Sequence, residues 1–204
     1  METRTSESSP IRVAKVVPPN RAGGWVGITI APGKKTPGLY NFWNRDLDTD
    51  LDRLKKLGVN TITPFLEDGE LERLRIPGLV EAAKARGMRV RRFPFHDMGI
   101  PENIDDAVLF VRTVVQQFQK GERVLMHCNG GLGRAGTMAA CVRLALGLDS
   151  GPEEAIATIR RLRGPRAIET REQERFVARF QKIWRNRMKC SDDNSLCNIS
   201  NDSQ

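Results

Sequence analysis

The sequence predicts a single α/β domain with a mainly parallel central sheet flanked by helices. Strand-like runs alternate with longer helix-like segments along the chain, which is typical of parallel sheets built from strand–helix–strand units. The length of 204 residues fits one domain, and 39% hydrophobic residues are enough for a sizeable core. We expect this domain at residues 23–187, a flexible N-terminal segment at 1–22 and a polar, disordered tail at 188–204.

Four runs rich in β-branched and apolar residues predict the strands. Their sequences are WVGITI, VNTITPF, MRVRRF and RVLMH, at residues 25–30, 59–65, 88–93 and 123–127. The stretches APGKKTPG at 31–38 and FPFHDMGIP at 93–101 predict loops, because proline and glycine interrupt regular structure.

Six segments predict helices. The first begins at Asp46, a favourable N-cap residue, places leucines at 47, 51, 54 and 57 on one face, and ends at Gly58. Four others are expected at 77–86, 104–120, 136–146 and 152–163. Thr170 is a good cap for the last helix, which we expect to run to about residue 187.

The composition describes a basic chain without a membrane or secretion signal. A net charge of +8 and a pI of about 9.7 fit either a solvated basic surface or an anionic partner. The arginines at 160, 161, 163 and 166 leave the same two alternatives open. No apolar run approaches the ~18 residues that span a bilayer, and METRTSESSP lacks the apolar stretch of a signal peptide. We therefore expect no membrane span and a cytoplasmic location.

The cysteines form no C-x-x-C pair and have no zinc-site spacing. We expect free thiols in a reducing compartment, with Cys141 in the core and Cys190 and Cys197 in the polar tail. No metal site is expected.

The stretch HCNGGLGRAGT at 127–137 has two interpretations. Gly131, Gly133 and Gly136 spell the G-x-G-x-x-G of a dinucleotide-binding loop. That fold needs a further strand before an acidic residue such as Asp149, but two predicted helices follow each other almost directly there. This interpretation is therefore disfavoured, and a phosphate loop of the Walker A type fits less well still, since no lysine precedes Thr137.

The second interpretation is a cysteine nucleophile in an anion-binding loop. A strand leads to Cys128, and a helix begins just past Arg134, so the free N–H groups of loop and helix converge on one place. Arg134 adds a planar donor that fits two phosphate oxygens, and the same positive field stabilises a thiolate. The phosphate-binding residues expected are Asn129, Gly130, Gly131, Leu132, Gly133 and Arg134.

The chemistry also needs a proton donor for the leaving oxygen. Asp97 lies in the loop FPFHDMGIP, between Pro94 and Pro101, after a predicted strand. Because the carboxyl ends of parallel strands share one edge of a sheet, Asp97 is expected to meet Cys128 there. The predicted catalytic residues are therefore Cys128, Arg134 and Asp97.

His127, Cys128 and Arg134 resemble the H-C-x5-R signature of the cysteine-dependent protein phosphatase superfamily, with Asp97 matching its acid loop. The length is similar to that of the dual-specificity branch, and the chain resembles in particular the kinase-associated phosphatases, known for interaction with cyclin-dependent kinases. The stretches that carry this resemblance are PGKKTPG, WNRDLDTDLDRLKKLGV, HCNGGLGRAG and AIETREQERFV.

The resemblance implies a protein-tyrosine-phosphatase-like fold and hydrolysis of phosphomonoesters through a phosphocysteine, with no cofactor. It implies a phosphorylated protein as substrate and a protein kinase as a candidate partner; a nucleic-acid partner is not expected, and we expect a monomer. His127 is expected to position the loop, while Thr137 and Gln173 are candidate supporting residues.

Two positions depart from the family pattern. Ala135 stands where a serine or threonine hydroxyl usually helps the thiolate leave, and His96 stands where proline usually precedes the acid-loop aspartate. Two other functions stay open at this point. One is a phosphoinositide or RNA 5′-phosphate phosphatase, although the five residues between Cys128 and Arg134 are uncharged. The other is a non-catalytic regulator that binds phosphoproteins or kinases.

Overall fold

The computed structural model describes residues 2–38 and 41–197, with side chains described as far as residue 188. A five-stranded sheet lies at its centre in the order β2-β3-β8-β6-β7. β3, β8, β6 and β7 run parallel, and β2 joins β3 antiparallel at one edge, so the predicted α/β fold with a mainly parallel sheet is confirmed. The bounds are Ala14–Val17 (β2), Trp25–Thr29 (β3), Arg123–His127 (β8), Thr61–Pro64 (β6) and Arg89–Val90 (β7).

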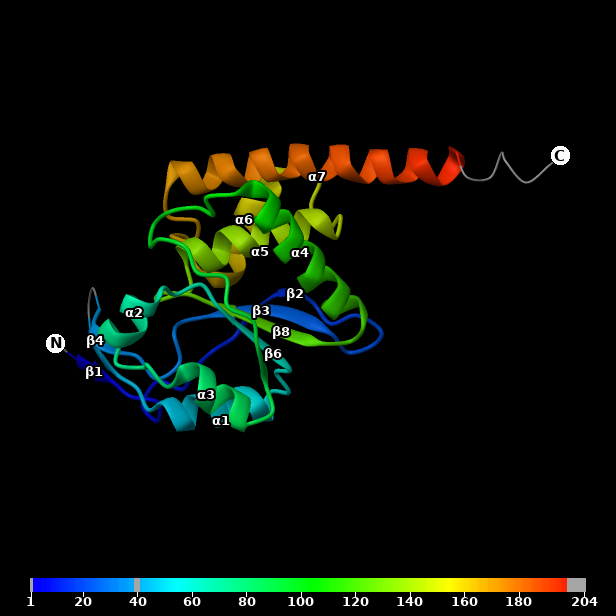
Figure 1. Ribbon diagram of the computed structural model, residues 1–204. Coiled ribbons are helices and arrows are strands. Elements are labelled where there is room, and N and C mark those ends of the chain that lie inside the picture. Colours follow the sequence, from blue (N-terminus) through cyan, green and yellow to red (C-terminus); the bar gives the residue numbers. More distant parts are fainter. Residues whose placement is uncertain (1, 39–40, 198–204) are drawn as a thin grey trace.

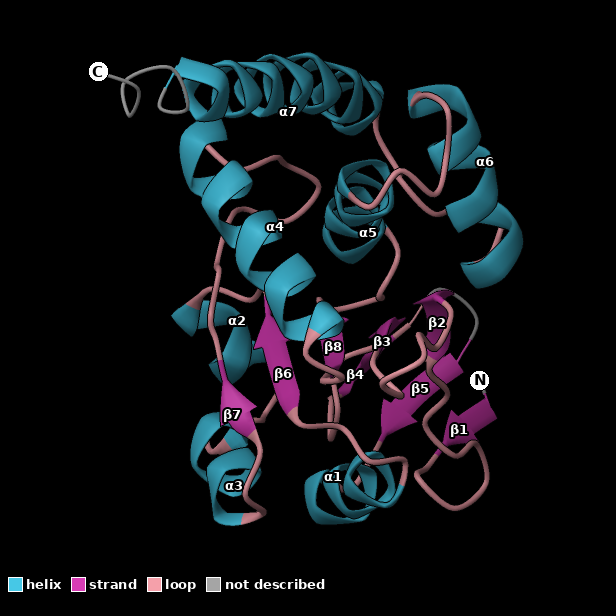
Figure 2. Cartoon of the chain, turned by 90° about the vertical axis from the view of Figure 1, so that its right-hand side faces the viewer, coloured by secondary structure: helices cyan, strands magenta, loops and turns pink. Residues whose placement is uncertain are grey.

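Helices cover both faces of this sheet (Figures 1 and 2). One face carries Ile104–Gln119 (α4), Gly133–Ala145 (α5), Pro152–Arg163 (α6) and Arg171–Cys197 (α7). The other carries Leu47–Lys56 (α1) and Leu79–Ala85 (α3), while Asp68–Arg73 (α2) lies at the carboxyl edge of the sheet. A separate core packs between the sheet and each helical layer, which fixes the sheet as a rigid support for the loops at its edge.

Two predicted helix starts have the expected caps. The Asp46 carboxylate accepts a hydrogen bond from the Thr49 N–H, and Thr170 Oγ1 accepts one from the Gln173 N–H. α5 differs from its prediction, because it begins at Gly133 rather than Gly136. Its first twelve residues are all buried, since sheet and helices surround it. The site loop therefore passes directly into a central, buried helix.

The N-terminal segment corrects the prediction of a flexible stretch at 1–22. β2 pairs with β3, and Val16, Val17 and Ile11 are fully buried in the two cores. A second small sheet joins Glu2–Arg4 (β1), Asn41–Asn44 (β5) and Lys35–Pro37 (β4), the last inside a predicted loop. These strands are short: β4 and β5 pair with each other as neighbours along the chain, whereas β1 forms by pairing with the distant β5 rather than by local propensity.

The C-terminal prediction also needs correction. α7 continues without a break past the expected domain end at residue 187 as far as Cys197, and no glycine or proline interrupts it there. The tail cysteines' side chains lie outside the described residues, as does the remainder of the predicted tail at 198–204. Among the described residues, no helix has the length and apolar character needed to cross a membrane.

Candidate active site

The cysteine loop lies at the carboxyl edge of the sheet. β8 is paired on both sides, with β3 and β6, and its last residue, His127, delivers Cys128 to the loop. Cys128 is only 3% exposed, and α5 begins five residues later at Gly133. The cysteine loop thus leads directly to the N-terminus of α5, and the free N–H groups of a helix N-terminus favour negative charge nearby.

Gly131 is required by the shape of this loop. Its φ is +64°, and a Cβ there would lie 2.2 Å from the carbonyl oxygen of Thr29 in the neighbouring strand. The loop thus curls back tightly onto the end of β3. This curvature turns the chain from the sheet into α5 and brings the predicted phosphate-binding residues 129–134 round Cys128.

Arg134 lies on the first turn of α5 and its side chain is fully buried. Its guanidinium donates to both carboxylate oxygens of Glu70 from α2, at 2.6 and 2.8 Å. Nη1 also donates to the carbonyl oxygens of Phe65 and Phe95. Its Nε is buried and has no hydrogen-bond partner in the structure. The Nη1 and Nη2 atoms are therefore held in place by protein oxygens, and the Nε–H remains as a donor for an anion.

Asp97 contacts Arg134 at the edge of the sheet that carries Cys128. Its Oδ1 lies 2.9 Å from Arg134 Nη2, and its side chain is 41% exposed. The next residue, Met98, has a φ of +63°, and its N–H donates to the Asp97 carboxylate. This left-handed turn directs the carboxyl group into the site while leaving it open to solvent.

Gln173 holds this acid loop rather than projecting into the cavity. Its Nε2 donates to the Gly99 carbonyl, and its Oε1 accepts from the Glu169 N–H. Thr170 also donates from its hydroxyl to the Met98 carbonyl. The start of α7 is therefore attached to the loop that carries Asp97.

Two further cations contact the cysteine loop from opposite sides. Lys34 Nζ donates to the backbone and side-chain oxygens of Asn129, at 3.1 and 3.2 Å. Arg163 donates to the carbonyl oxygens of Gly130 and Gly131, at 2.8 and 2.9 Å. Burial lowers the pKa of Lys34 to about 8 and lowers that of Arg163, and the Cys128 sulfur partly offsets both effects. Reciprocally, both cations stabilise negative charge on the sulfur.

The arginine run is therefore not simply a solvated face. Arg160 pairs with Glu174 and donates to the carbonyls of Ala167 and Ile168. Arg163 supports the loop, and Arg166 lines the cavity above it. Arg161 is exposed. Two of the four arginines, Arg163 and Arg166, therefore line the cavity.

The remaining predicted residues have supporting or neutral places. His127 is fully buried, and burial lowers its pKa to about 4, so its imidazole is neutral at physiological pH. The Thr137 hydroxyl donates to the Gly133 carbonyl within α5, so that bond does not replace the hydroxyl missing at Ala135. His96 is exposed and lies near Glu67.

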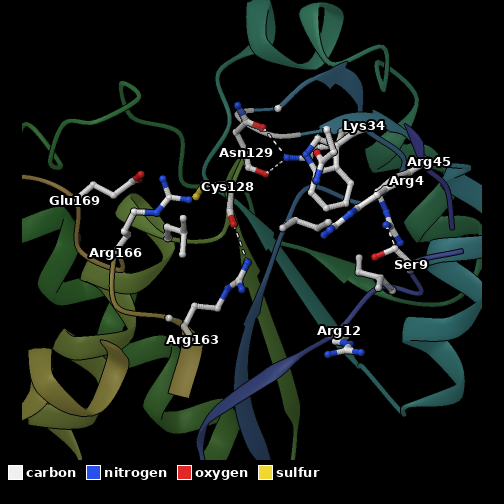
Figure 3. A pocket seen from close by; sticks show the side chains of 18 of the residues that line it. Arg4, Ser9, Arg12, Lys34, Arg45, Cys128, Asn129, Arg163, Arg166 and Glu169 are labelled. Atoms are coloured by element: carbon white, nitrogen blue, oxygen red, sulfur yellow. Dashed lines mark hydrogen bonds between the residues drawn. The ribbon is translucent and has the colours of Figure 1, made fainter. Parts of the chain in front are cut away.

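A cavity of about 960 Å³ opens above the loop (Figure 3). Cys128, Asn129, Asp97 and Glu169 are among the residues that line it, and Figure 3 shows Glu169 and Lys34 on opposite sides of Cys128. Burial raises the pKa of Glu169, and the nearby Asp97 carboxylate raises it further. The cavity thus combines the cysteine, the acid loop and several cations in one place.

Glu70, Lys34 and Arg163 are site residues without an assigned role in the sequence prediction. The glutamate in DGELER looks like any polar helix residue, and no local signal marks its pairing with Arg134. Lys34 lies within PGKKTPG, one of the stretches that carry the family resemblance, and that is its only sequence signal.

The two buried cysteines are expected to differ in reactivity. Burial strongly raises the pKa of the Cys141 thiol, whereas Cys128 lies among cations at the cavity floor. Brief treatment with iodoacetamide at neutral pH should alkylate Cys128 and leave Cys141 unmodified, as read by peptide mass mapping. Equal labelling of the two peptides would contradict this assignment, and phosphate added beforehand should protect Cys128 alone.

The chain is similar to known phosphatases over most of its length. A family model described as cyclin-dependent kinase inhibitor 3 (CDKN3) matches residues 2–156. Human cyclin-dependent kinase inhibitor 3 is 31% identical over 157 residues, covering 77% of this chain and 72% of that protein. A putative tyrosine phosphatase of invertebrate iridescent virus 3 is 30% identical over 102 residues, covering 43% of this chain and 42% of that protein.

A solved structure agrees with these matches. A crystal structure of kinase associated phosphatase, in which serine replaces the catalytic-site cysteine, has a TM-score of 0.77 and 29% identity. The match covers 86% of this chain and 97% of the chain in that crystal structure. The fold, the signature loop and the extent of the family match agree. The chain belongs to the cyclin-dependent kinase inhibitor 3 family and is a cysteine-dependent protein phosphatase of the dual-specificity type.

Proposed function

We propose that Cys128, Arg134 and Asp97 carry out the hydrolysis of phosphomonoesters on a phosphorylated protein, through a phosphocysteine. The observation that carries this proposal is the guanidinium of Arg134. Protein groups hold it on one side, and its buried Nε has no partner beside the cysteine loop. A donor fixed in this way favours an oxyanion, because little reorganisation is needed when charge develops.

In the first step, the Cys128 thiolate attacks phosphorus, and the bond from phosphorus to the leaving oxygen breaks. Asp97 gives its proton to that oxygen, which leaves as an alcohol or phenol. In the second step, water attacks the phosphocysteine while Asp97 takes a proton from it. The sulfur–phosphorus bond breaks, so that inorganic phosphate leaves and the thiolate is restored.

Arg134 links binding to proton transfer in this scheme. Its Nη2 contacts Asp97, and an incoming phosphate competes with that carboxyl group for the same donors. Substrate binding thus releases Asp97 toward the leaving oxygen. The loop N–H groups of residues 129–134 hold the other phosphate oxygens, while Lys34 and Arg163, which also line the cavity, donate to backbone oxygens of the loop and support it.

Replacing Asp97 with asparagine is expected to lower kcat toward a phosphopeptide by about a hundredfold or more, because the leaving oxygen loses its proton donor. The defect should be much smaller for an activated aryl phosphate, whose leaving group needs no proton. Cys128→Ser serves as the inactive control, and Asp106→Asn, on exposed surface of α4, as the matched one. An equal loss on both substrates would refute the acid role.

A phosphorylated protein kinase is part of the proposal as substrate or partner, since the relatives are named as inhibitors of cyclin-dependent kinases. We also propose that the protein acts as a monomer in the cytoplasm. Pull-down of phosphorylated kinases by Cys128→Ser, released by phosphate, would test the partner. A purely regulatory, non-catalytic role is disfavoured because the nucleophile and the acid line one cavity and the acid contacts the Arg134 guanidinium.

A further inference from the structure

The cavity has a second group of cations, away from the acid loop. We name it the Trp43 cluster, and it consists of Arg4, Lys34, Trp43 and Arg45. Lys34 Nζ lies 4.9 Å from the centre of the indole ring, with the guanidinium carbons of Arg45 and Arg4 at 5.8 and 6.0 Å. β1 supplies Arg4 and β5 supplies Trp43, so the small sheet builds this wall of the cavity.

The cluster carries more positive charge than its carboxylates neutralise. Arg45 is matched by Asp50, through two hydrogen bonds of 2.7 Å between buried side chains. Arg4 has Glu2 at 3.6 Å, but both side chains are largely exposed, so solvent screens that pair. Lys34 differs from both, because its hydrogen bonds in the described structure go to the uncharged oxygens of Asn129.

Lys34 is the most informative member of the cluster. It is 4% exposed, and burial is the main cause that lowers its pKa. A buried ammonium group without a carboxylate is unfavourable unless an anion completes its surroundings. The Cys128 sulfur supplies part of this negative charge, and because Lys34 also lines the cavity, an anionic group of the substrate can supply more.

The size of the cavity fits a substrate with more than one anionic group. The scissile phosphate needs only the cysteine loop and Arg134, whereas the cavity of about 960 Å³ extends from Cys128 to the Trp43 cluster (Figure 3). Arg12 also lines it and is exposed, with no carboxylate partner among the described residues. The positive field therefore continues well beyond the reaction centre.

We propose that the Trp43 cluster is a second anion subsite, which binds a further phosphate group on the same polypeptide substrate as the scissile phosphate. This inference rests on the proposed function, because it assigns the substrate class of that same cavity. Lys34 and Arg4 donate hydrogen bonds to the second phosphate, and cation–π interactions with the indole of Trp43 keep both side chains at the cavity wall.

A peptide fits this cavity better than a lipid headgroup at a membrane. Of the large hydrophobic side chains that are exposed in the described structure, Met98 alone lines the cavity. The rim thus lacks the apolar surface that inserts between lipids. An extended peptide advances about 3.3 Å per residue, so residues near the scissile one can reach along the cavity.

The test compares matched synthetic phosphopeptides with the full-length protein. One series carries a single phosphoresidue, and the other adds a second phosphoserine one, two or three positions to either side. At the best spacing, kcat/KM is expected to rise about tenfold for the doubly phosphorylated peptide. The gain should fall as salt is added, since exposed charges are screened.

The readout is the ratio of kcat/KM for the doubly phosphorylated peptide to kcat/KM for the singly phosphorylated one. The variants Arg4→Gln and Lys34→Met are expected to bring this ratio close to one. A general loss of activity on both peptides does not affect it. Arg21→Gln, an exposed arginine near the opposite edge of the sheet, should keep the full gain. A wild-type ratio near one at every spacing would overturn the inference, as would a gain that survives in both variants.

The outcomes also separate this inference from the proposed function. If the wild-type protein turned over neither peptide faster than Cys128→Ser does, the proposed function itself would be refuted. Turnover of both peptides at equal efficiency would remove the second subsite alone. Preference for a phosphoinositide bisphosphate in vesicles, with no gain for any doubly phosphorylated peptide, would replace the peptide by a lipid substrate.

Discussion

Replacing Arg134 with lysine is expected to lower kcat/KM for an aryl phosphate by about a thousandfold or more. Removing a single fixed donor from an oxyanion site costs about 10²–10³ in rate, and lysine loses the planar fork altogether. A lysine ammonium cannot donate to Glu70 through two parallel hydrogen bonds and still present a donor to phosphate. Steady-state kinetics with an aryl phosphate measures the effect.

The matched control is Arg161→Lys, on the exposed surface of α6, which should change kcat/KM little. Circular dichroism should establish that both variants keep the fold. An Arg134→Lys protein that folds and retains more than about a tenth of the wild-type efficiency would contradict the role of the guanidinium.

Replacing Glu70 with alanine is expected to destabilise the protein by about 3–5 kcal/mol, because it leaves the buried Arg134 charge without its main partner. Activity should also fall, since the guanidinium loses the contacts that orient it. Urea unfolding followed by fluorescence gives the free energy of unfolding. Glu72→Ala, at an exposed position of the same helix, should change it by less than about 1 kcal/mol.

The ion pair between Glu70 and Arg134 also predicts how the free energy of unfolding depends on pH. Burial acts to raise the pKa of Glu70, but hydrogen bonds from Arg134 and from the Glu67 N–H, together with the charges of Arg134 and Arg73, outweigh it, so the folded-state pKa is lowered. Ionised Glu70 therefore stabilises the fold above the unfolded-state value of about 4.3, and this contribution is lost as the pH falls through the folded-state pKa. The stability difference between wild type and Glu70→Gln should thus shrink in acid. A difference that stays constant to low pH would contradict this.

Much of the central fold could be predicted because its signals are local. The strands β3, β6, β7 and β8 each lie in one of the four runs that predict strands, and Asp46 marks the start of α1. β2 was missed because its four residues lie in a polar, proline-containing stretch, and pairing with β3 forms it. Likewise, α2 is only six residues long, too short for an apolar face to recur.

The candidate site likewise contains residues that local sequence signals indicate and residues that they do not. Cys128 and Arg134 were predictable because they share one loop, and Asp97 because parallel strands end at one edge. Glu70 and Lys34 could not be assigned, since what defines them is a partner 64 or 95 positions away in the sequence. Burial of a charged side chain is a tertiary property, and the local sequence holds no record of it.

The first residues of the chain form part of the cavity. Because β1 pairs with β5 and places Arg4 beside Trp43, β1 borders the same cavity as the reacting sulfur. A protease that clips the chain between β1 and β2 would strip this border while leaving Cys128, Arg134 and Asp97 in place. If the Trp43 cluster binds a second phosphate as proposed, such trimming would turn a discriminating enzyme into a more permissive one, and β1 would then act in substrate selection.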